Sequence, residues 1–175
     1  MNIALVAHDS RKEEIVEWFK YNLNELKTHK LFATGTTGKL LRDAYQENLE
    51  DSECIYDIRP TSENWDRYNK EAEDLVTCLH SGPLGGDQEI GAMIAKGEID
   101  VLIFFCDNLI QQGHQNDVSA LTRLASLYNI AFATNRTTAD MILTSPLFKD
   151  PNYKRILPSA IERYKERFNF KNEKK

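Results

Sequence analysis

Five short apolar runs constrain the fold of this chain more than any other feature. They occupy residues 3–7, 30–33, 75–79, 100–105 and 130–133, and helical patterns separate them. The first run is continuously apolar, as expected of a parallel strand covered on both faces. Between the first two runs Ile15, Phe19, Leu23 and Leu26 recur at helical spacing. This alternation predicts an α/β fold of three layers, in which helices cover both faces of a mostly parallel five-stranded sheet.

The length of 175 residues suits a single domain, 1–175, with a full core. A stretch at about 46–73 interrupts the pattern, because it is acidic, predicted to be irregular up to residue 60, and then polar around Trp65 and Tyr68. It is too short to bury a core of its own, so we interpret it as a surface insertion. From about residue 158 the chain is charged, and we expect a helical C-terminal tail.

Charge and cysteine content narrow the classes of partner and compartment. A net charge of −5 argues against a nucleic-acid surface, which normally carries a basic stripe. The three cysteines, Cys54, Cys78 and Cys106, have no metal-ligand spacing and favour a reducing, intracellular setting. The first residues run directly into a predicted strand without a signal peptide, and no run approaches the ~20 apolar residues of a membrane helix. We therefore expect a cytoplasmic protein that does not span a membrane.

Polar or glycine-rich segments follow four of the predicted strands. Right-handed crossovers place the carboxyl ends of parallel strands at one edge of the sheet. The segments are therefore expected to converge there and form the active site. They contain His8 and Asp9 with Lys12, residues 34–38, residues 81–87 and residues 107–117.

The sequence Thr-Gly-Thr-Thr-Gly at 34–38 offers backbone N–H groups and hydroxyls at the start of a helix, which favours phosphate binding. An ordinary strand-to-helix turn with a threonine cap is an equal alternative from this motif alone. Lys12 lies one helical turn beyond His8 and would be the counter-charge of a phosphate there. By itself such a lysine is usually a solvated charge.

The sequence Ser-Gly-Pro-Leu-Gly-Gly-Asp-Gln at 81–88 predicts a tight loop that exposes its backbone. The carboxylate of Asp87 is unfavourable for binding an anion but suited to removing a proton. The alternative is that Asp87 merely caps the following helix.

Two of the four histidines, His8 and His114, fall at the predicted edge, and His29 is expected to be solvated at the opposite edge. His80 adjoins the 81–88 loop without a further signal. Two histidines among several aspartates indicate proton transfer, whereas their spacing disfavours a metal site. The aspartates concerned are Asp9, Asp87, Asp107 and Asp117.

Five segments, in this order, resemble the methylglyoxal synthase family. They are Ile-Ala-Leu-Val-Ala-His-Asp at 3–9, Ala-Thr-Gly-Thr-Thr-Gly at 33–38, the 81–88 loop, Ile-Asp-Val-Leu-Ile-Phe-Phe at 99–105 and Ala-Thr-Asn at 133–135. The resemblance covers about residues 1–42 and 76–146. Two departures stand out: the segment at about 43–75 is longer than usual in the family, and the loop before His114 lacks the usual prolines.

The resemblance implies a Rossmann-like, methylglyoxal synthase-like fold and conversion of dihydroxyacetone phosphate into methylglyoxal and inorganic phosphate. It also implies a homohexamer without metal or organic cofactor, often inhibited by phosphate. Catalytic roles would fall to Asp87, His114 and Asp117, with Asp9 and Asp107 supporting the site. Substrate would be held by His8, Lys12, Thr34, Gly35, Thr36, Thr37, Ser81, Gly82 and His114.

Two other functions fit the same motifs. A regulatory module of this fold would bind a phosphate-containing effector without turnover, as in carbamoyl-phosphate synthetase. An isomerase would start from the same enediolate intermediate. The presence of both Asp87 and His114 favours the synthase, because a sensor needs only the phosphate-binding groups.

Overall fold

A wholly parallel sheet lies at the centre of the molecule. The computed structural model describes residues 1–54, 61–109 and 115–172. Its five strands lie in the order β3-β2-β1-β4-β5, and every strand pair in this described part is parallel. The strands are β1 (Asn2–Ala7), β2 (Lys30–Ala33), β3 (Val76–Cys78), β4 (Val101–Phe105) and β5 (Ala131–Ala133). The expected mostly parallel sheet is confirmed.

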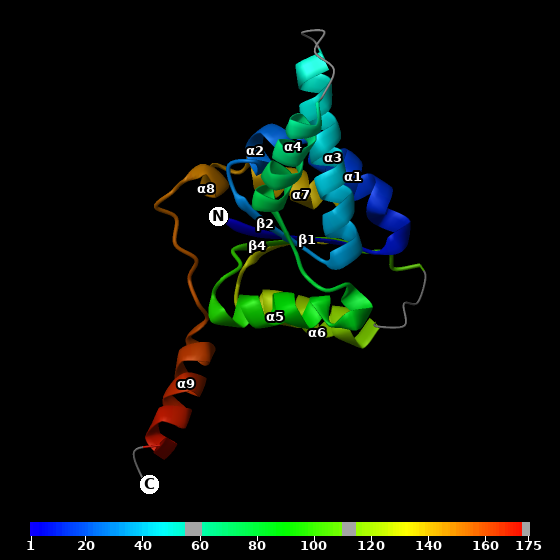
Figure 1. The fold of residues 1–175 in the computed structure, drawn as a ribbon. Coiled ribbons are helices and arrows are strands. Elements are labelled where there is room, and N and C mark those ends of the chain that lie inside the picture. Colours follow the sequence, from blue (N-terminus) through cyan, green and yellow to red (C-terminus); the bar gives the residue numbers. More distant parts are fainter. Residues whose placement is uncertain (55–60, 110–114, 173–175) are drawn as a thin grey trace.

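Helices cover both faces of the sheet, as Figure 1 shows. On one face lie α1 (Lys12–Tyr21), α2 (Leu23–Leu26), α3 (Gly35–Cys54), α7 (Arg136–Thr144) and α8 (Pro146–Lys149). The other face carries α5 (Gly86–Lys96) and α6 (Gln115–Leu127). Side chains of β1 alternate between the two cores, with Ile3 and Leu5 packed on the first face and Ala4 and Val6 on the second. The three-layer α/β sandwich is therefore confirmed.

One predicted helix cap is wrong. The patterns favour Thr137 or Thr138 as the N-cap of α7, but the cap is Asn135, whose side chain accepts a hydrogen bond from the N–H of Thr138 at 3.0 Å. Inside α7, Asp140 accepts a hydrogen bond from Trp18 Nε1 at 2.7 Å. That bond satisfies the indole of a fully buried tryptophan and ties α7 to α1.

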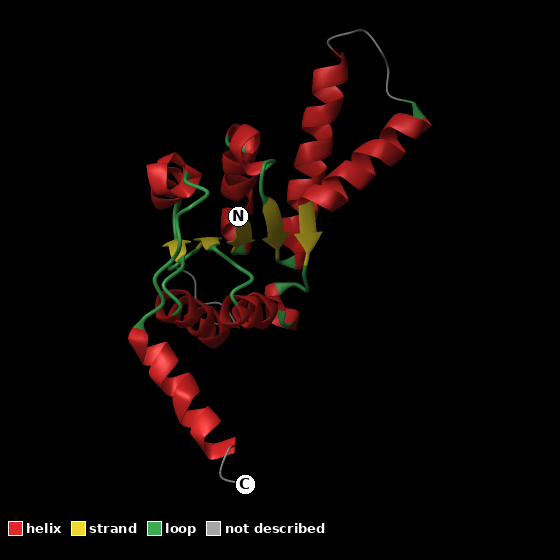
Figure 2. Cartoon of the chain, turned by 90° about the vertical axis from the view of Figure 1, so that its left-hand side faces the viewer, coloured by secondary structure: helices red, strands yellow, loops and turns green. Residues whose placement is uncertain are grey.

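Residues 47–54, which the sequence predicts to be irregular, are helical, and residues 55–60 of the same predicted stretch lie outside the described residues. Helix α3 continues to Cys54, and α4 (Ser62–Leu75) packs back against it, so that the two helices project beyond the sheet (Figure 2). Thr61 caps α4 through the N–H of Asn64. Because α4 continues through Leu75, β3 starts one residue later than predicted.

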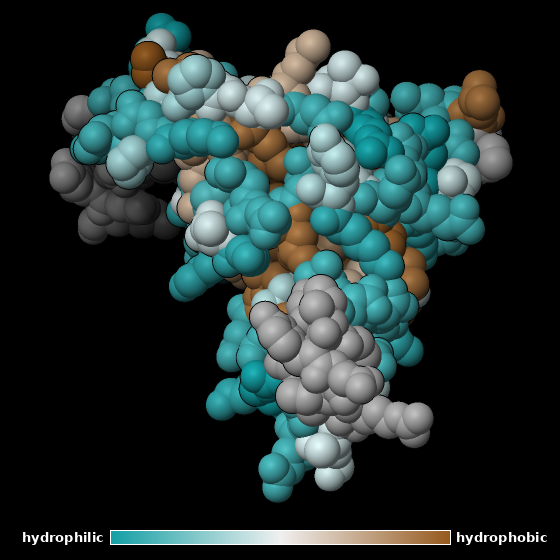
Figure 3. All heavy atoms as spheres, turned by 90° about the horizontal axis from the view of Figure 1, so that it is seen from above, coloured by the Kyte–Doolittle hydropathy of each residue, from teal (hydrophilic) through white to brown (hydrophobic). Residues whose placement is uncertain are grey.

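Helix α9 (Ser159–Asn172) extends away from the body of the molecule (Figures 1 and 2). Of its side chains that the structure describes, Ile161 is the buried one. Within residues 1–54, 61–109 and 115–172, no helix combines the length and apolar character needed to span a membrane. The face in Figure 3 is mostly hydrophilic, and apolar side chains show mainly in the middle of the view.

Candidate active site

The carboxyl ends of β1 and β4 form the topological switch point of the sheet. From β1 the chain proceeds outward to β2 and β3, and then returns to place β4 on the other side of β1. In open parallel sheets the crevice beyond such a pair of strands is the usual ligand site. The loops after these strands contain His8 and Asp107, which the sequence places in the site.

A cleft of about 400 Å³ lies at this edge. The cleft is lined by residues of the loops after β1, β2 and β3 and of the first turn of α6. Those of its lining residues that the sequence assigns to the site are His8, Asp9, Lys12, Thr34, Thr36, Thr37, Gly82 and Asp117. Three of the four polar segments therefore meet at the cleft through the loops after β1, β2 and β3. The fourth segment, residues 107–117, reaches the cleft through Asp117 at the start of α6.

His8 is held by the loop that follows β4. Its side chain is 4% exposed, and its Nδ1 accepts a hydrogen bond from the backbone N–H of Asp107 at 2.8 Å. The imidazole also packs edge-on against the ring of Phe104, with 5.0 Å between ring centroids. The ring is therefore fixed in orientation at the wall of the cleft.

Lys12 supplies a positive charge to the cleft. It starts α1, directly after the short 3-10 turn η1 (Asp9–Arg11), and its Nζ lies 2.5 Å from Asp9 Oδ1. The lysine side chain is only 17% exposed, whereas that of Asp9 is 89% exposed. Asp9 thus holds the ammonium group from the solvent side and leaves Lys12 at the cleft.

The first turn of α3 points into the same cleft. A helix N-terminus presents N–H groups that lack partners within the helix, together with the positive end of the helix dipole. Thr37 is 1% exposed, and its Oγ1 has no hydrogen-bond partner among the described residues. A long helix whose start is flanked by the buried side chains of Thr34 and Thr37, with a lysine beside it, is suited to an anion such as phosphate.

Close backbone packing joins the loop after β2 to the loop after β3. The N–H of Gly35 donates to the carbonyl of His80 at 3.0 Å, and a Cβ at Gly35 would lie 3.0 Å from Ser81 N. A Cβ at Gly86 would lie 1.9 Å from His80 O, and Gly85 has a φ of 107°. Only glycine fits at Gly86, and the positive φ of Gly85 favours glycine there, so the 81–88 motif fixes the distance between the two loops.

Asp87 lies in the first turn of α5, directly after this glycine pair. It is 2% exposed and does not line the cleft itself. The lining residues from its loop are Gly82 and Pro83, in the 3-10 turn η2 (Gly82–Leu84). The N-cap of α5 is Gly85, with no side-chain cap. The alternative that Asp87 merely caps the helix is therefore wrong.

Not every predicted site residue lines the cleft. Gly35, Ser81 and Asp107 are not among its lining residues, whereas Asp117, in the first turn of α6, is one of them. His114 lies outside the described residues. The interpretation of His114 therefore stays a prediction.

The two cysteines of the described core are poor nucleophiles. Burial raises the pKa of the Cys106 thiol to about 11, and burial likewise raises the pKa of Cys78. Both are free thiols that stay protonated at neutral pH. Among residues 1–54, 61–109 and 115–172, no three or more His, Cys, Asp and Glu side chains group in a way that could hold a metal ion.

Comparisons with known proteins identify the family. A family model described as "MGS-like domain" matches residues 61–134. A methylglyoxal synthase of Proteus mirabilis is 44% identical over 167 residues, covering 92% of each chain, and one of Maridesulfovibrio salexigens is 46% identical, covering 85% of each. The chain belongs to the methylglyoxal synthase family.

A solved structure carries the same family name. The crystal structure of methylglyoxal synthase from Elizabethkingia anophelis matches with a TM-score of 0.65 and 38% identity, covering 90% of this chain and 92% of the other. The methylglyoxal synthase-like fold expected from the five motifs is confirmed. Family membership also shows an enzyme, and it does not favour the regulatory-module alternative.

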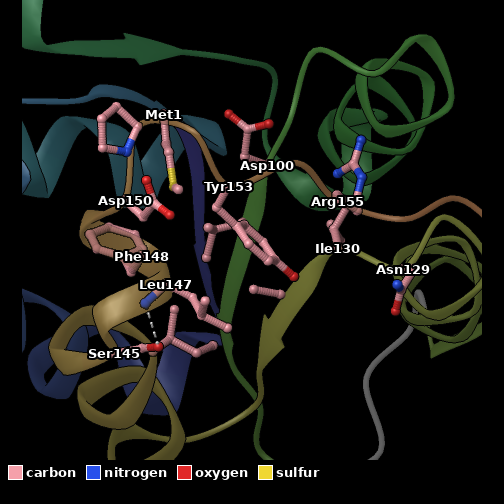
Figure 4. Close-up of a pocket in the computed structure, with 14 residues that line it drawn as sticks. Met1, Asp100, Asn129, Ile130, Ser145, Leu147, Phe148, Asp150, Tyr153 and Arg155 are labelled. Carbon is pink, nitrogen blue, oxygen red and sulfur yellow. Dashed lines mark hydrogen bonds between the residues drawn. The ribbon is translucent and has the colours of Figure 1, made fainter.

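A larger cavity, of about 610 Å³, lies at the opposite edge of the sheet (Figure 4). Met1, Asp100 and Ala131 line it at the starts of strands, and Tyr153 lies between Phe148 and Ile130. None of the predicted site residues lines this cavity. The smaller cleft, where the charged and hydroxyl groups converge, is therefore the candidate active site.

Three further polar residues differ from the sequence interpretation. His29 is half-buried against the ring of Phe148, and burial lowers its pKa, so the expectation of a solvated histidine is wrong. His80 pairs with Glu89, with 2.7 Å between Nδ1 and Oε1. Ser10 was missed altogether: its Oγ donates to Asp107 Oδ2 at 2.5 Å. The only signal for Ser10 is its position between His8 and Lys12.

Proposed function

We propose that this chain is a methylglyoxal synthase that converts dihydroxyacetone phosphate into methylglyoxal and inorganic phosphate. One observation carries the proposal: the cleft at the β1–β4 switch point combines an anion-binding helix start with Lys12 and His8, and the adjoining loop leads directly into buried Asp87. The shared name of the curated relatives supports the same reaction. A phosphate-binding site beside a carboxylate is suited to removing a proton from a phosphorylated substrate.

The first chemical step assigns the base role to Asp87. Its carboxylate removes a proton from the carbon that carries the hydroxyl, next to the carbonyl, and the electron pair forms an enediolate. His114 would polarise the carbonyl or move protons between the two oxygens, an electrophilic role suited to a neutral imidazole. Asp117 lines the same cleft and would orient His114 or substrate.

Elimination follows from the enediolate. Its electrons re-form a carbonyl while the bond from carbon to the phosphate oxygen breaks, and inorganic phosphate leaves. The resulting enol takes up a proton at its terminal carbon and becomes methylglyoxal. The departing charge would be stabilised by Lys12, the first N–H groups of α3, the hydroxyls of Thr34, Thr36 and Thr37, and the backbone around Gly35, Ser81 and Gly82. Every step uses protein groups, with no metal or organic cofactor.

Geometry decides between elimination and simple isomerisation. The bond to phosphate breaks readily only when it stands out of the enediolate plane, so the phosphate site must select that conformation. Asp9 and Asp107 would support this arrangement by holding Lys12 and His8. An isomerase would release glyceraldehyde 3-phosphate instead.

One assay tests the proposal. Purified protein given dihydroxyacetone phosphate is expected to release phosphate and a dicarbonyl, and Asp87→Asn is expected to lower kcat by about two to four orders of magnitude. The variant should bind inorganic phosphate at least as tightly as the parent, because a negative charge near the anion is removed. Phosphate binding without turnover in the parent contradicts the proposal, and glyceraldehyde 3-phosphate as main product identifies an isomerase.

We also propose the assembly and location that the family resemblance implies: a cytoplasmic homohexamer, inhibited by its product phosphate. The free thiols of Cys78 and Cys106 fit a reducing compartment. We interpret residues 1–175 as one domain, with an insertion at about 46–73 and a helical tail from about 158. Light scattering on the purified chain tests the hexamer directly.

A further inference from the structure

The hydrogen bond between Asp107 and His8 determines which nitrogen of the imidazole carries hydrogen. Its donor is a backbone N–H, which can only donate, so Nδ1 of His8 must accept with a lone pair. The neutral ring therefore carries its hydrogen on Nε2. If Nδ1 carried the hydrogen, it would point at the N–H of Asp107, and two donors would face each other without an acceptor. The arrangement selects one neutral tautomer and disfavours the imidazolium.

The carboxylate of Asp107 is itself held by hydrogen bonds from Ser10 and Leu109. Ser10 Oγ donates to Oδ2 at 2.5 Å, and the N–H of Leu109 donates to Oδ1 at 2.8 Å. Ser10 belongs to η1, the turn that directly follows His8. The loops after β1 and β4 are thus joined twice, once by Ser10 to the carboxylate and once by the backbone of Asp107 to His8.

We propose that Ser10 is a positioning residue, which holds Asp107 so that His8 presents a neutral Nε2–H donor to the phosphorylated substrate in the cleft. The proposal rests on the proposed function and adds a specific division of roles to it. Lys12 supplies the positive charge, and His8 supplies a directed hydrogen bond without a second charge. A neutral donor binds phosphate without the added Coulomb attraction that a second cation would exert on the leaving product.

The tautomer of His8 is measured without reference to activity. Protein labelled with nitrogen-15 only in histidine contains four labelled rings, and the signals missing in His8→Gln are those of His8. Near neutral pH, we expect nitrogen NMR to show His8 with an unprotonated Nδ1 and a protonated Nε2. A ring protonated on Nδ1 overturns the proposal.

Ser10→Ala separates positioning from a structural role. Without the hydroxyl, the Asp107 carboxylate loses the bond from Ser10 and keeps the bond from the N–H of Leu109. His8 is then expected to populate both tautomers, with its nitrogen signals moving toward an average. The KM for dihydroxyacetone phosphate and the Kd for inorganic phosphate should both rise by roughly threefold to tenfold, the effect of one lost hydrogen bond. Since this interaction binds ground state and transition state alike, kcat should change less than about twofold.

Two matched variants complete the test. Ser10→Thr keeps the hydroxyl and is expected to restore the parent's KM and nitrogen signals. Ser126→Ala removes an exposed serine of α6 and is expected to change neither. Parental nitrogen signals and phosphate affinity in Ser10→Ala overturn the proposal. If the parent fails to turn over dihydroxyacetone phosphate, the proposed function fails, whereas the NMR signals and phosphate affinity still decide the role of Ser10.

Discussion

Gly86 is a residue of the candidate site where the structure leaves no room for a side chain. A side chain there would run into the carbonyl of His80 at 1.9 Å, which is part of the backbone and cannot rotate away. The same carbonyl accepts the N–H of Gly35, so a shift would also move the start of α3. The glycine therefore sets the spacing between the anion-binding helix start and Asp87.

We predict that Gly86→Ala destabilises the protein by about 3 kcal/mol, because the backbone must move to admit the methyl group. Gly97→Ala is the control: its φ of 79° is unfavourable for alanine, but nothing lies within 4 Å of the added Cβ. That variant should lose about 1–2 kcal/mol. Urea unfolding of both variants measures the difference, and an equal loss in the two contradicts the packing argument.

At the scale of elements, α3 and α4 pack against each other through contacts of their own. Tyr68 of α4 is 1% exposed, whereas Trp65, one turn earlier, is 40% exposed and meets the Tyr68 ring edge-on. Arg42 of α3 donates from Nε to the carbonyl of Val76 at 2.8 Å and joins the pair to the start of β3. Tyr68 is therefore the large buried side chain of α4, whose other buried residue is Ala72.

We predict that Tyr68→Ala costs about 3–4 kcal/mol of stability, because a large buried ring is replaced by a cavity. Trp65→Ala is the matched control and should cost about 1 kcal/mol, since it loses mainly the ring contact. Denaturant midpoints measure both. Comparable losses in the two variants would show that α4 is not anchored through Tyr68.

The start of α5 carries a pH-sensitive contact. Hydrogen bonds from the backbone N–H of His80 and from its ring hold the pKa of Glu89 below the ordinary value of 4.5. A carboxyl group whose pKa is depressed by folding stabilises the folded state above its unfolded pKa, and this contribution is lost as pH falls through the folded value.

Glu89→Gln is therefore predicted to be less stable than the parent at neutral pH, and the difference should vanish as the solution is acidified below the Glu89 pKa. Urea midpoints of both proteins over a series of pH values measure it. A difference that persists below the Glu89 pKa would mean that the carboxylate is not what stabilises this contact.

At the scale of the whole molecule, the C-terminal part leaves apolar side chains uncovered. Ile156, shortly before the projecting helix α9, is 79% exposed, and Tyr164, within α9, is 64% exposed. Exposed apolar groups gathered on one segment are typical of surfaces that other chains cover. They fit the proposed homohexamer.

Removal of the residues after Pro158 tests this interpretation. The truncated chain keeps the sheet and the cleft, and of the described α9 side chains it loses only Ile161 from the buried set. We expect it to fold, to bind inorganic phosphate, and to show a lower mass than the full chain by light scattering. An unchanged mass would place the contacts of the assembly elsewhere.

The sequence by itself determined the strands, their common edge and most of the cleft, because these follow from local patterns. Continuous apolar runs specify buried parallel strands, and right-handed crossovers then bring His8, Thr34, Gly82 and Asp117 to one edge. The glycines of the 81–88 loop likewise indicate close backbone packing wherever they occur. The five motifs were sufficient to indicate the family.

The tertiary structure alone decided contacts between groups far apart in the chain. No local pattern shows that the N–H of Asp107 donates to His8 or that Ser10 holds the Asp107 carboxylate, because the pairing depends on β1 lying beside β4. The burial of His29 depends in the same way on α8, and the helical course of residues 47–54 is that of α3, against which α4 packs. Polar patterns specify which groups are available, whereas packing specifies which groups meet.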